Sequence, residues 1–364
     1  MRNLRASYGM IHARYEFRLL SGVRLLIAAA LCAPLAGCYV MHAARGQWDV
    51  MGRREPIAAV VADPATPVPL KSQLESVVAI RDFSVKELGL PDNDSYRSYA
   101  DVQRQYVVWN VFATEEFSVE PQNWCFPISG CVSYRGYFNE QKARDFAAKL
   151  AKRGYDVHVG GVPAYSTLGH FADPVLNTML RWSDVQLAAI IFHELAHQVV
   201  YVPGDSSFNE GFASVVEAEG VRRWLDSAGR TADLESFRRQ RADYLQVGRL
   251  FEATRARLRT LYASELPVEE MRAAKQAEFA ALRQAYEEHK STAGGGRANF
   301  DAWFEQGINN AHLASVGTYQ DCVPGLRHLL AEAGNDLPAF YARAREFAKR
   351  DATARRAELC ASKE

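Results

Sequence analysis

The sequence predicts an α+β fold in which helices dominate, and three observations lead to that class. The 364 residues are 48% apolar, and 43 basic side chains balance 43 acidic ones, so the chain can bury a core. Most segments with a clear pattern place apolar residues at helical spacing. Only two short runs, 106–113 and 156–160, have the β-branched and aromatic character of strands. No boundary in the chain requires two independent domains.

The charge balance excludes one class of partner. With a formal net charge of zero and no compact Lys/Arg cluster beyond the first segment, the chain offers no field to hold nucleic acid phosphates. No solenoid period or coiled-coil heptad is evident either. We therefore exclude nucleic acid as a partner, while the sequence leaves the oligomeric state open.

The first 37 residues have the pattern of a secretory signal. Residues 1–24 carry five arginines against one acid, Glu16, and the apolar run 25–31 follows them. A membrane-spanning helix needs about 20 apolar residues, and this run is shorter and soon meets Pro34. A basic start, a short apolar core and small residues at the cut are typical of a signal that is removed. The length before the apolar run favours a true start at Met10.

Leu-Ala-Gly-Cys at 35–38 resembles the bacterial lipobox. The resemblance implies that residues 1–37 are removed, that Cys38 is lipidated, and that residues 38–69 form a tether. Each buried methylene of the lipid contributes about 0.8 kcal/mol, which makes a multiply acylated cysteine a durable anchor in the membrane. By resemblance to lipoprotein sorting, Tyr39 in place of an Asp after the cysteine favours the outer membrane, so we expect an envelope lipoprotein facing the periplasm. The alternative is a small-residue turn with an incidental cysteine.

The four cysteines of the mature chain are candidates for disulfides; they are Cys125, Cys131, Cys322 and Cys360. An even number in an oxidising compartment indicates disulfides, with three alternative pairings. Pro and Gly within 126–130 could turn the chain back and join Cys125 to Cys131, which would leave Cys322 to pair with Cys360. Four free thiols are the alternative. No Cys-x-x-Cys spacing supports a zinc knuckle.

Spacing distinguishes helices from strands along the first half of the body. Residues 70–88 have apolar side chains at helical spacing. The strand 106–113 follows, then a helix over 139–153 and the second strand over 156–160. Segment 160–167 is either a sheet edge that pairs with a substrate backbone or a plain loop.

Helices fill the second half. Ser183 with Gln186 three residues later is a capping box, and the apolar positions continue to Val200. Further helices are expected over 207–224, 233–262, 267–291, 299–313 and 324–357. The two long charged helices in this set are solvated arms or lids, and the sequence does not decide between them.

His-Glu-Leu-Ala-His at 193–197 is the most specific pattern in the chain. Residues four apart lie on one helix face, so His193 and His197 can bind one ion. Zinc accepts neutral imidazole nitrogens at about 2.0–2.1 Å and keeps an open position for water in catalytic sites. Glu194 lies beside that face, where it can take a proton from the water. The alternative is a pair of core histidines bonded to backbone carbonyls.

A second motif, Asn-Glu-Gly-Phe-Ala, follows at 209–213. Together the motifs resemble the gluzincin metallopeptidases, in particular the aminopeptidase N type, and more of the chain resembles bacterial lipoproteins described as putative aminopeptidases. The resemblance implies a zincin-like metallopeptidase domain with a small N-terminal mixed sheet and an appended helical region. It also implies one zinc ion held by His193, His197 and Glu210, with water as the fourth ligand.

On this interpretation the chain has five segments. They are the signal peptide 1–37, the lipid-anchored tether 38–69, a zincin-like core 70–230, a charged helical arm 231–296 and C-terminal helices 297–364 that close the cleft.

The link between the two motifs departs from the aminopeptidase N type. Twelve residues separate His197 from Glu210, fewer than in that type, so the chain must reverse tightly at Pro203-Gly204. Ser207-x-x-Glu210 is also a capping box, in which Glu210 would bond its own helix start. Glu217, two turns along the same face, is a substitute third ligand or an outer partner of the ligands.

Peptide hydrolysis also needs a group that stabilises the oxyanion. By resemblance to other zincins, this group is a Tyr or His from a separate segment. Residues 307–319 are polar and punctuated by Gly, which makes Tyr319 the first candidate and His312 the second; a surface Tyr or a core His is the alternative. The Gly-x-Met-x-Asn segment of the aminopeptidase N type is missing, so aminopeptidase specificity rests on the family resemblance alone.

Two hypotheses of function follow. The first is an envelope-anchored zinc metallopeptidase, an aminopeptidase by resemblance, that acts on peptide substrates with Glu194 activating the water. The second is an inactive envelope scaffold or binding protein that retains the fold. Glu194 favours the enzyme, because a purely structural zinc site has no use for a general base.

Overall fold

The computed structural model describes residues 39, 41–126, 130–292, 300–316 and 322–360. The chain divides into two compact units, Met1–Asp49 and Val50–Glu364, and the elements below belong to the second. The expected signal segment, the lipidation candidate Cys38 and the oxyanion candidate Tyr319 lie outside the described residues. None of the described helices is long and apolar enough to cross a membrane.

A small mixed sheet of order β1-β2-β8 begins the second unit. Its strands are β1 (Glu55–Pro56), β2 (Ser98–Ala100) and β8 (Val175–Leu176), and the adjoining helices are α2 (Ile57–Ala62) and α3 (Val68–Lys86). β2 pairs antiparallel with β1 and parallel with β8. The segment expected as a tether over 38–69 thus contributes to the body from Val50 onward, since Val50 is fully buried in the main core. Ile57 and Val60, three residues apart on α2, are buried in the same core.

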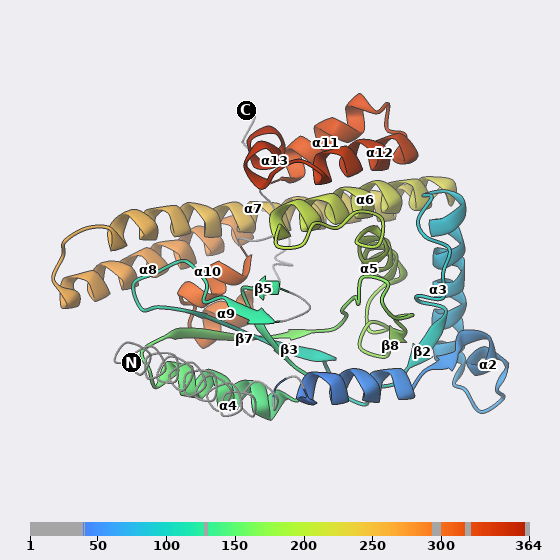
Figure 1. Ribbon diagram of the computed structural model, residues 1–364, viewed down its shortest axis with the longest axis horizontal. Coiled ribbons are helices and arrows are strands. Elements are labelled where there is room, and N and C mark those ends of the chain that lie inside the picture. Colours follow the sequence, from blue (N-terminus) through green and yellow to red (C-terminus); the bar gives the residue numbers. More distant parts are fainter. Residues whose placement is uncertain (1–38, 40, 127–129, 293–299, 317–321, 361–364) are drawn as a thin grey trace, which may run out of the picture. The chain divides into compact units, whose positions relative to one another are not determined.

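The second sheet is antiparallel, with the order β6-β3-β7. Its strands are β3 (Val108–Thr114), β6 (Arg135–Tyr137) and β7 (Asp156–Val162). β3 and β7 correspond to the two strands that the sequence predicts. Helices α4 (Glu140–Ala151) and α10 (Asn310–Val316) contact both of these strands and lie on opposite sides of the sheet (Figure 1). A separate hairpin of β4 (Trp124–Phe126) and β5 (Gly130–Val132) is joined by the disulfide Cys125–Cys131.

Helices α5 (Asp184–Ala196) and α6 (Ser206–Ser227) lie at the centre of the main core. Their apolar side chains pack with those of α3 and of the C-terminal helices to form one continuous cluster. Leu195 and Phe212, which lie within the two sequence motifs, are fully buried. The two helices with the motifs are therefore among the most strongly packed elements of the body.

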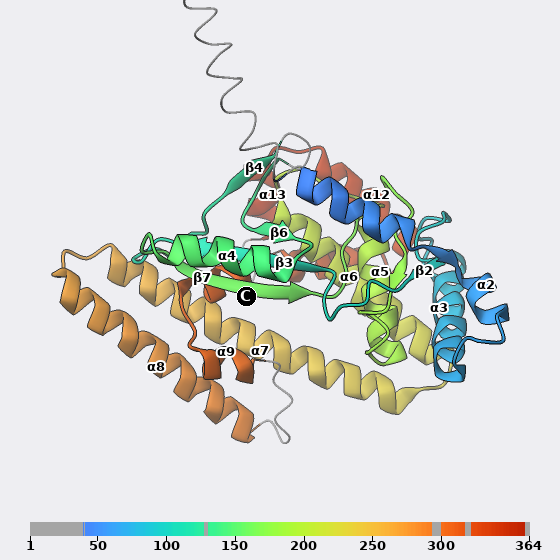
Figure 2. The ribbon, with the colours of Figure 1, turned by 90° about the horizontal axis from the view of Figure 1, so that it is seen from below.

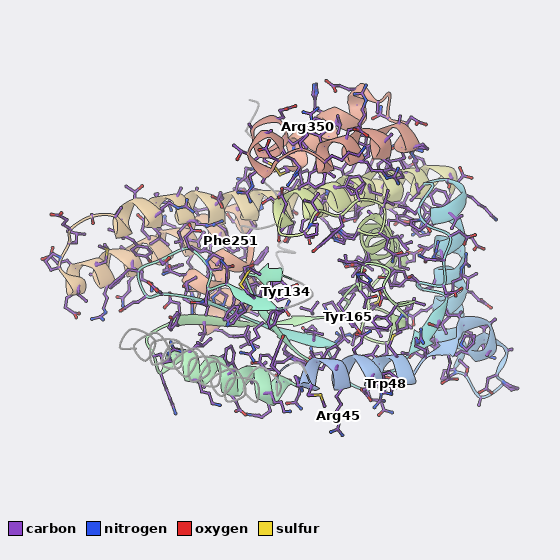
Figure 3. The ribbon with its side chains drawn as sticks, viewed as in Figure 1. Arg45, Trp48, Tyr134, Tyr165, Phe251 and Arg350 are labelled. Carbon is purple, nitrogen blue, oxygen red and sulfur yellow. A yellow bond between two sulfur atoms is a disulfide. The ribbon has the colours of Figure 1, made fainter. Side chains whose placement is uncertain are left out.

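The long charged helices α7 (Thr231–Tyr262) and α8 (Val268–Thr292) lie side by side as a hairpin (Figure 2). They are not solvated along their whole length, because they share a second apolar cluster with α9 (Asp301–Gln306) and α10. Phe251 of α7 lies inside this cluster (Figure 3). The sequence predicts one helix over 299–313, whereas α9 and α10 are separate. The break falls at Gly307, whose φ of 92° is in the left-handed region that favours glycine.

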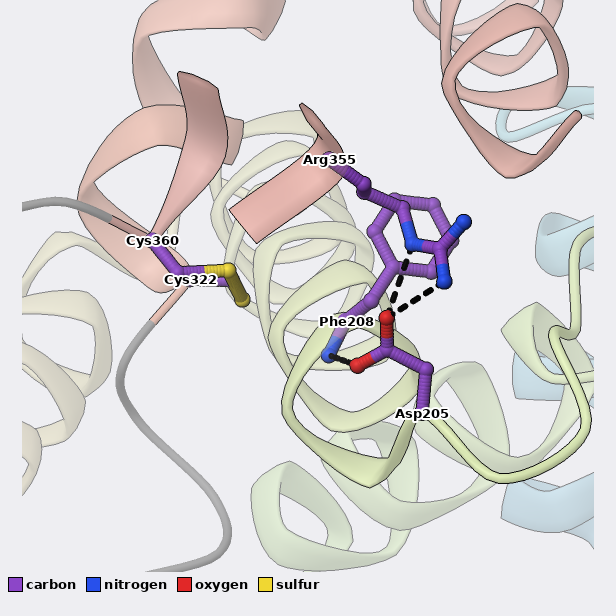
Figure 4. Close-up of a disulfide and its surroundings, with 5 residues drawn as sticks. All are labelled: Asp205, Phe208, Cys322, Arg355 and Cys360. Atoms are coloured by element: carbon purple, nitrogen blue, oxygen red, sulfur yellow. Dashed lines mark hydrogen bonds and ion pairs between the residues drawn. A yellow bond between two sulfur atoms is a disulfide. The ribbon is translucent and has the colours of Figure 1, made fainter. Parts of the chain in front are cut away.

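Three short helices follow in place of the single stretch expected over 324–357. They are α11 (Val323–Glu332), α12 (Leu337–Ala348) and α13 (Ala352–Leu359). Asp336 and Asp351 start α12 and α13, because each side chain accepts hydrogen bonds from backbone N–H groups of the following turn. α11 packs against α6, and the disulfide Cys322–Cys360 joins its start to the end of α13 (Figure 4).

Loss of the Cys322–Cys360 disulfide should lower the stability of the body more than loss of the Cys125–Cys131 disulfide. The two bonds close loops of 38 and 6 residues. The chain-entropy model assigns them about 4 and about 2 kcal/mol. Urea unfolding of the two double Cys→Ala variants measures the difference in the free energy of unfolding. Equal losses, or a larger loss for the short loop, would contradict this assignment.

Candidate metal centre

Helix α5 includes His193 and is followed directly by His197, its C-cap residue, and its start is fixed by a capping box. Ser183 Oγ accepts from Gln186 N at 3.3 Å, and Gln186 Oε1 accepts from Ser183 N at 3.1 Å. The helix then runs with its apolar face in the main core. His193 and His197 follow one turn apart, and their ring centroids are 4.9 Å from each other.

The chain reverses direction between α5 and α6 in a short, tightly bonded turn. The side chain of Asn209 closes this turn, because its Oδ1 accepts from Val202 N and its Nδ2 donates to Val202 O, both at 2.8 Å. Gly204 has a φ of 81°, a conformation that costs glycine little. The twelve-residue link is thus long enough to return the second motif to the first.

Asp205, and not Ser207, caps the start of α6. Its Oδ1 accepts from Phe208 N at 3.2 Å. Its Oδ2 accepts from Arg355 Nε at 2.8 Å and lies 2.6 Å from Arg355 Nη2, and both side chains are almost fully buried (Figure 4). The start of α6 therefore needs no bond from Glu210, whose carboxylate turns toward α5 instead.

The structure brings His193, His197 and Glu210 together. One ligand atom of each residue lies within 4.8 Å of the other two. Glu210 Oε2 is 3.2 Å from His193 Nε2, and Glu210 Oε1 is 3.7 Å from His197 Nε2. The His197 side chain is only 7% exposed, against 18% for His193 and 21% for Glu210. The group is thus enclosed on one side and accessible on the other.

Glu217 lies outside this group and orients one of its histidines. Its Oε2 is 3.0 Å from His193 Nδ1, the ring nitrogen that faces away from Glu210. Its Oε1 accepts from Arg241 Nη1 at 2.7 Å, and Arg241 Nη2 donates to the Ser214 carbonyl at 3.0 Å. A carboxylate on the second nitrogen fixes the ring and makes the first nitrogen a better ligand. Glu217 is therefore an outer partner of the ligands and not a substitute for Glu210.

Burial and charge set the protonation of the group. Burial opposes the charge on His193, but the hydrogen bonds to Glu210 and Glu217 outweigh it and raise the pKa of His193 well above the usual value. Burial, followed by the charge on His193, lowers the pKa of His197 to about 4. Burial would raise the pKa of Glu210, but its bond to His193 lowers it. His193 is thus bonded to two carboxylates, of which Glu217 is also paired with Arg241.

Glu194 is the residue after His193, but it does not belong to the group of His193, His197 and Glu210. Burial raises the pKa of Glu194 to about 7; the charge on His193 opposes the rise, and that on Glu210 adds to it. Tyr96 lies close by, since burial and then the charge of Glu194 raise the pKa of its phenol well above the usual value. A carboxyl group that titrates near neutral pH can both accept and return a proton.

The second oxyanion candidate, His312, belongs to a different cluster. Its ring lies 4.1 Å from that of His158 and 5.1 Å from that of Trp303, and Asn309 Oδ1 is 2.9 Å from its Nδ1. Burial, followed by the charge of His158, lowers the pKa of His312 to about 3. His312 is thus a neutral histidine of the core, which is the alternative that the sequence analysis gave to an oxyanion-stabilising role. Tyr319 lies outside the described residues.

Sequence reasoning missed two residues beside the group. The Tyr201 ring centroid is 6.4 Å from that of His197, and burial followed by the charge of Glu210 raises the pKa of its phenol. α5 ends at Ala196, whereas the sequence predicts that it continues to Val200, so Tyr201 lies in the connection after the helix and helical spacing gives no signal for it. Arg241 comes from α7, 24 residues from Glu217, and nothing in the local sequence indicates their contact.

The donors are of the kinds that bind a divalent cation, and their spacing can be compared with that of a zinc site. Ligand atoms of a tetrahedral zinc site with bonds of about 2.0–2.1 Å lie about 3.3 Å apart. The separations from Glu210 to the two histidines, 3.2 and 3.7 Å, are close to this value. Nε2 is the nitrogen of His197 that faces Glu210, whereas Nδ1 is buried without a hydrogen-bond partner among the described residues. Two imidazoles and one carboxylate are a common zinc-binding set.

Comparison with known proteins adds a family assignment. A family model described as "Putative aminopeptidase" matches residues 38–359, which is well over half of the chain and includes both motifs. Neither the curated proteins nor the solved structures gave a match.

Removal of the Arg355 side chain should destabilise the body strongly. Arg355→Met leaves Asp205 buried without its cationic partner, which costs about 3–5 kcal/mol. The control is Arg350→Met, which removes a partly exposed partner of Glu358 and should cost less than about 1 kcal/mol. Urea unfolding measures both losses in the free energy of unfolding. Similar small losses would show that the buried pair does not hold α13 to α6.

Glu217→Gln should weaken zinc binding without abolishing it. The amide no longer provides the charged partner of His193 Nδ1, and loss of such a partner lowers metal affinity about 10–100-fold. Competition with a chromophoric chelator measures the affinity. Asp226→Asn, an exposed substitution on the same helix, is the control and should leave the affinity unchanged. An unchanged affinity in Glu217→Gln would exclude the proposed outer role.

Proposed function

The chain belongs to the putative aminopeptidase family, and we propose that it is a zinc-dependent metallopeptidase that hydrolyses peptide bonds, with free N-termini as its preferred substrates. The observation that carries the proposal is the convergence of His193, His197 and Glu210 beside Glu194. Three zinc-type ligands and an adjacent carboxylic acid meet the needs of metal-assisted hydrolysis. A structural zinc site has four protein ligands and no need of a base, and only three ligands converge among the described residues.

Each residue has a distinct part in this proposal. His193, His197 and Glu210 hold the ion, and Glu217 keeps the His193 ring in the orientation that the ion requires. Zinc bound there would polarise the substrate carbonyl and increase the acidity of water. Glu194 accepts the proton of the attacking water and returns it to the leaving amine nitrogen. Tyr201 is our candidate for stabilising the oxyanion, because its ring is beside His197 and it is 43% exposed.

The edge of the second sheet is a place for the substrate backbone. β7 is an outer strand in the order β6-β3-β7, so its second edge has no strand partner among the described residues. An extended peptide can add to such an edge through main-chain hydrogen bonds. Gly160 and Gly161 on β7 keep side-chain bulk away from the strand. A Cβ at Gly161 would lie 2.3 Å from Tyr106 Cδ2, so substitution there would move the aromatic ring that covers the strand.

The N-terminal segment bears on where the protein acts in the cell. We propose that the chain is anchored in the cell envelope through lipid on Cys38, with its body in the periplasm, because residues 1–38 resemble a lipoprotein signal. The disulfides Cys125–Cys131 and Cys322–Cys360 are compatible with that oxidising compartment. The proposed gluzincin assignment rests on the two motifs at 193–197 and 209–213.

Glu194→Gln should lower peptide hydrolysis about 10²–10⁴-fold while the protein keeps one equivalent of zinc, because it removes a base and leaves the ligands intact. Metal analysis and a panel of fluorogenic peptides, with free and with blocked N-termini, measure the two effects. Glu235→Gln, an exposed substitution on α7, is the control. Absence of zinc, or undiminished hydrolysis by Glu194→Gln, would favour the scaffold hypothesis. Hydrolysis of blocked peptides only would exclude the aminopeptidase preference.

A further inference from the structure

A pocket of about 300 Å³ lies between α6, α7 and α11. Its wall includes four arginines and only one acid, Glu219; the arginines are Arg222, Arg238, Arg241 and Arg327. The rest of its wall is mainly apolar, with Leu234, Phe237 and Leu330 among the lining residues. Such a volume is at the lower end of the range for small-molecule sites.

The single acid of this pocket does not balance its basic charge. Both oxygens of Glu219 are already bonded, to Arg222 at 2.7 and 2.8 Å and to Arg223 at 2.7 Å. Arg238 and Arg327 have no acidic partner among the described residues, in contrast to Arg222 and Arg241. Burial, followed by the charge of Arg241, lowers the pKa of Arg327, so these two cations repel each other across the pocket.

Arg241, which also lines this pocket, has a donor that the described residues do not satisfy. Its Nη1 and Nη2 are bonded to Glu217 and to the Ser214 carbonyl, but its Nε is buried without a hydrogen-bond partner among the described residues. The side chain is only 17% exposed. A buried donor without an acceptor costs free energy.

We propose that this pocket binds a small organic anion, in which a carboxylate or phosphate group meets Arg238, Arg241 and Arg327 and a short apolar part packs on Phe237. Arginine side chains bind carboxylates and phosphates through paired, charge-assisted hydrogen bonds. Charge alone would suit any anion, but the apolar wall favours one with a hydrocarbon portion. This inference does not depend on the proposed hydrolysis, although Arg241 links the pocket to the candidate metal centre through Glu217.

Direct binding to the whole protein tests the pocket without any assay of activity. Isothermal titration at low ionic strength uses four probes: hexanoate, phenyl phosphate, inorganic phosphate and the neutral hexanamide. We expect hexanoate or phenyl phosphate to bind more tightly than inorganic phosphate, and hexanamide not to bind. Comparison of the first two probes distinguishes a carboxylate from a phosphate ligand. Equal affinity for inorganic and phenyl phosphate would overturn the apolar part of the proposal.

Substitutions locate the binding. Arg327→Gln should weaken the preferred probe at least tenfold, since it removes a cation that faces the ligand and has no acidic partner. Arg239→Gln is the matched control, because Arg239 is next to Arg238 on α7 but 70% exposed and outside the pocket wall. Thermal unfolding of both variants establishes that they are folded. Absence of binding by both organic anions, or equal weakening in the two variants, would overturn the proposal.

Discussion

The pair of hydrogen bonds between Asn209 and the backbone of Val202 is the constraint on which the candidate metal centre depends. These bonds close the reversal between α5 and α6. Without a closed reversal, Glu210 could not face the histidines across so short a link. Asp205 contributes to the same reversal. It caps the start of α6, so the Glu210 carboxylate is not needed there and turns toward α5. A local feature of the backbone thus decides whether three residues from two helices form one site.

Positive and negative side chains alternate along one chain of contacts at that site. His193 is held between Glu210 and Glu217, and Arg241 holds Glu217 from the next helix. Each of these side chains thus has a partner of opposite sign, which reduces the cost of burying it. The final cation, Arg241, also lines the basic pocket between α6, α7 and α11. The candidate metal centre and the pocket are therefore connected through Arg241 and Glu217.

Sequence reasoning succeeds where short-range spacing determines the structure. The capping box at Ser183, the two histidines four residues apart and the β-branched run of β3 are all local patterns, and the corresponding elements are present. The divisions between α9 and α10 and among α11–α13 were missed, because apolar spacing continues across Gly307 and Asp336. Contacts such as Glu217–Arg241 and Asp205–Arg355 join distant segments, so they depend on the packing of whole helices and have no local signal.

Anomalous X-ray scattering at the zinc edge, from crystals of the purified chain, tests the central claim most directly. The account predicts a single strong peak within bonding distance of His193 Nε2, His197 Nε2 and the Glu210 carboxylate. A peak elsewhere in the body would contradict this prediction. So would the absence of any peak in excess zinc while the His193–Glu210 hydrogen bond is intact. In either of those cases the enclosed group would be a buried ion-pair network and not a metal centre.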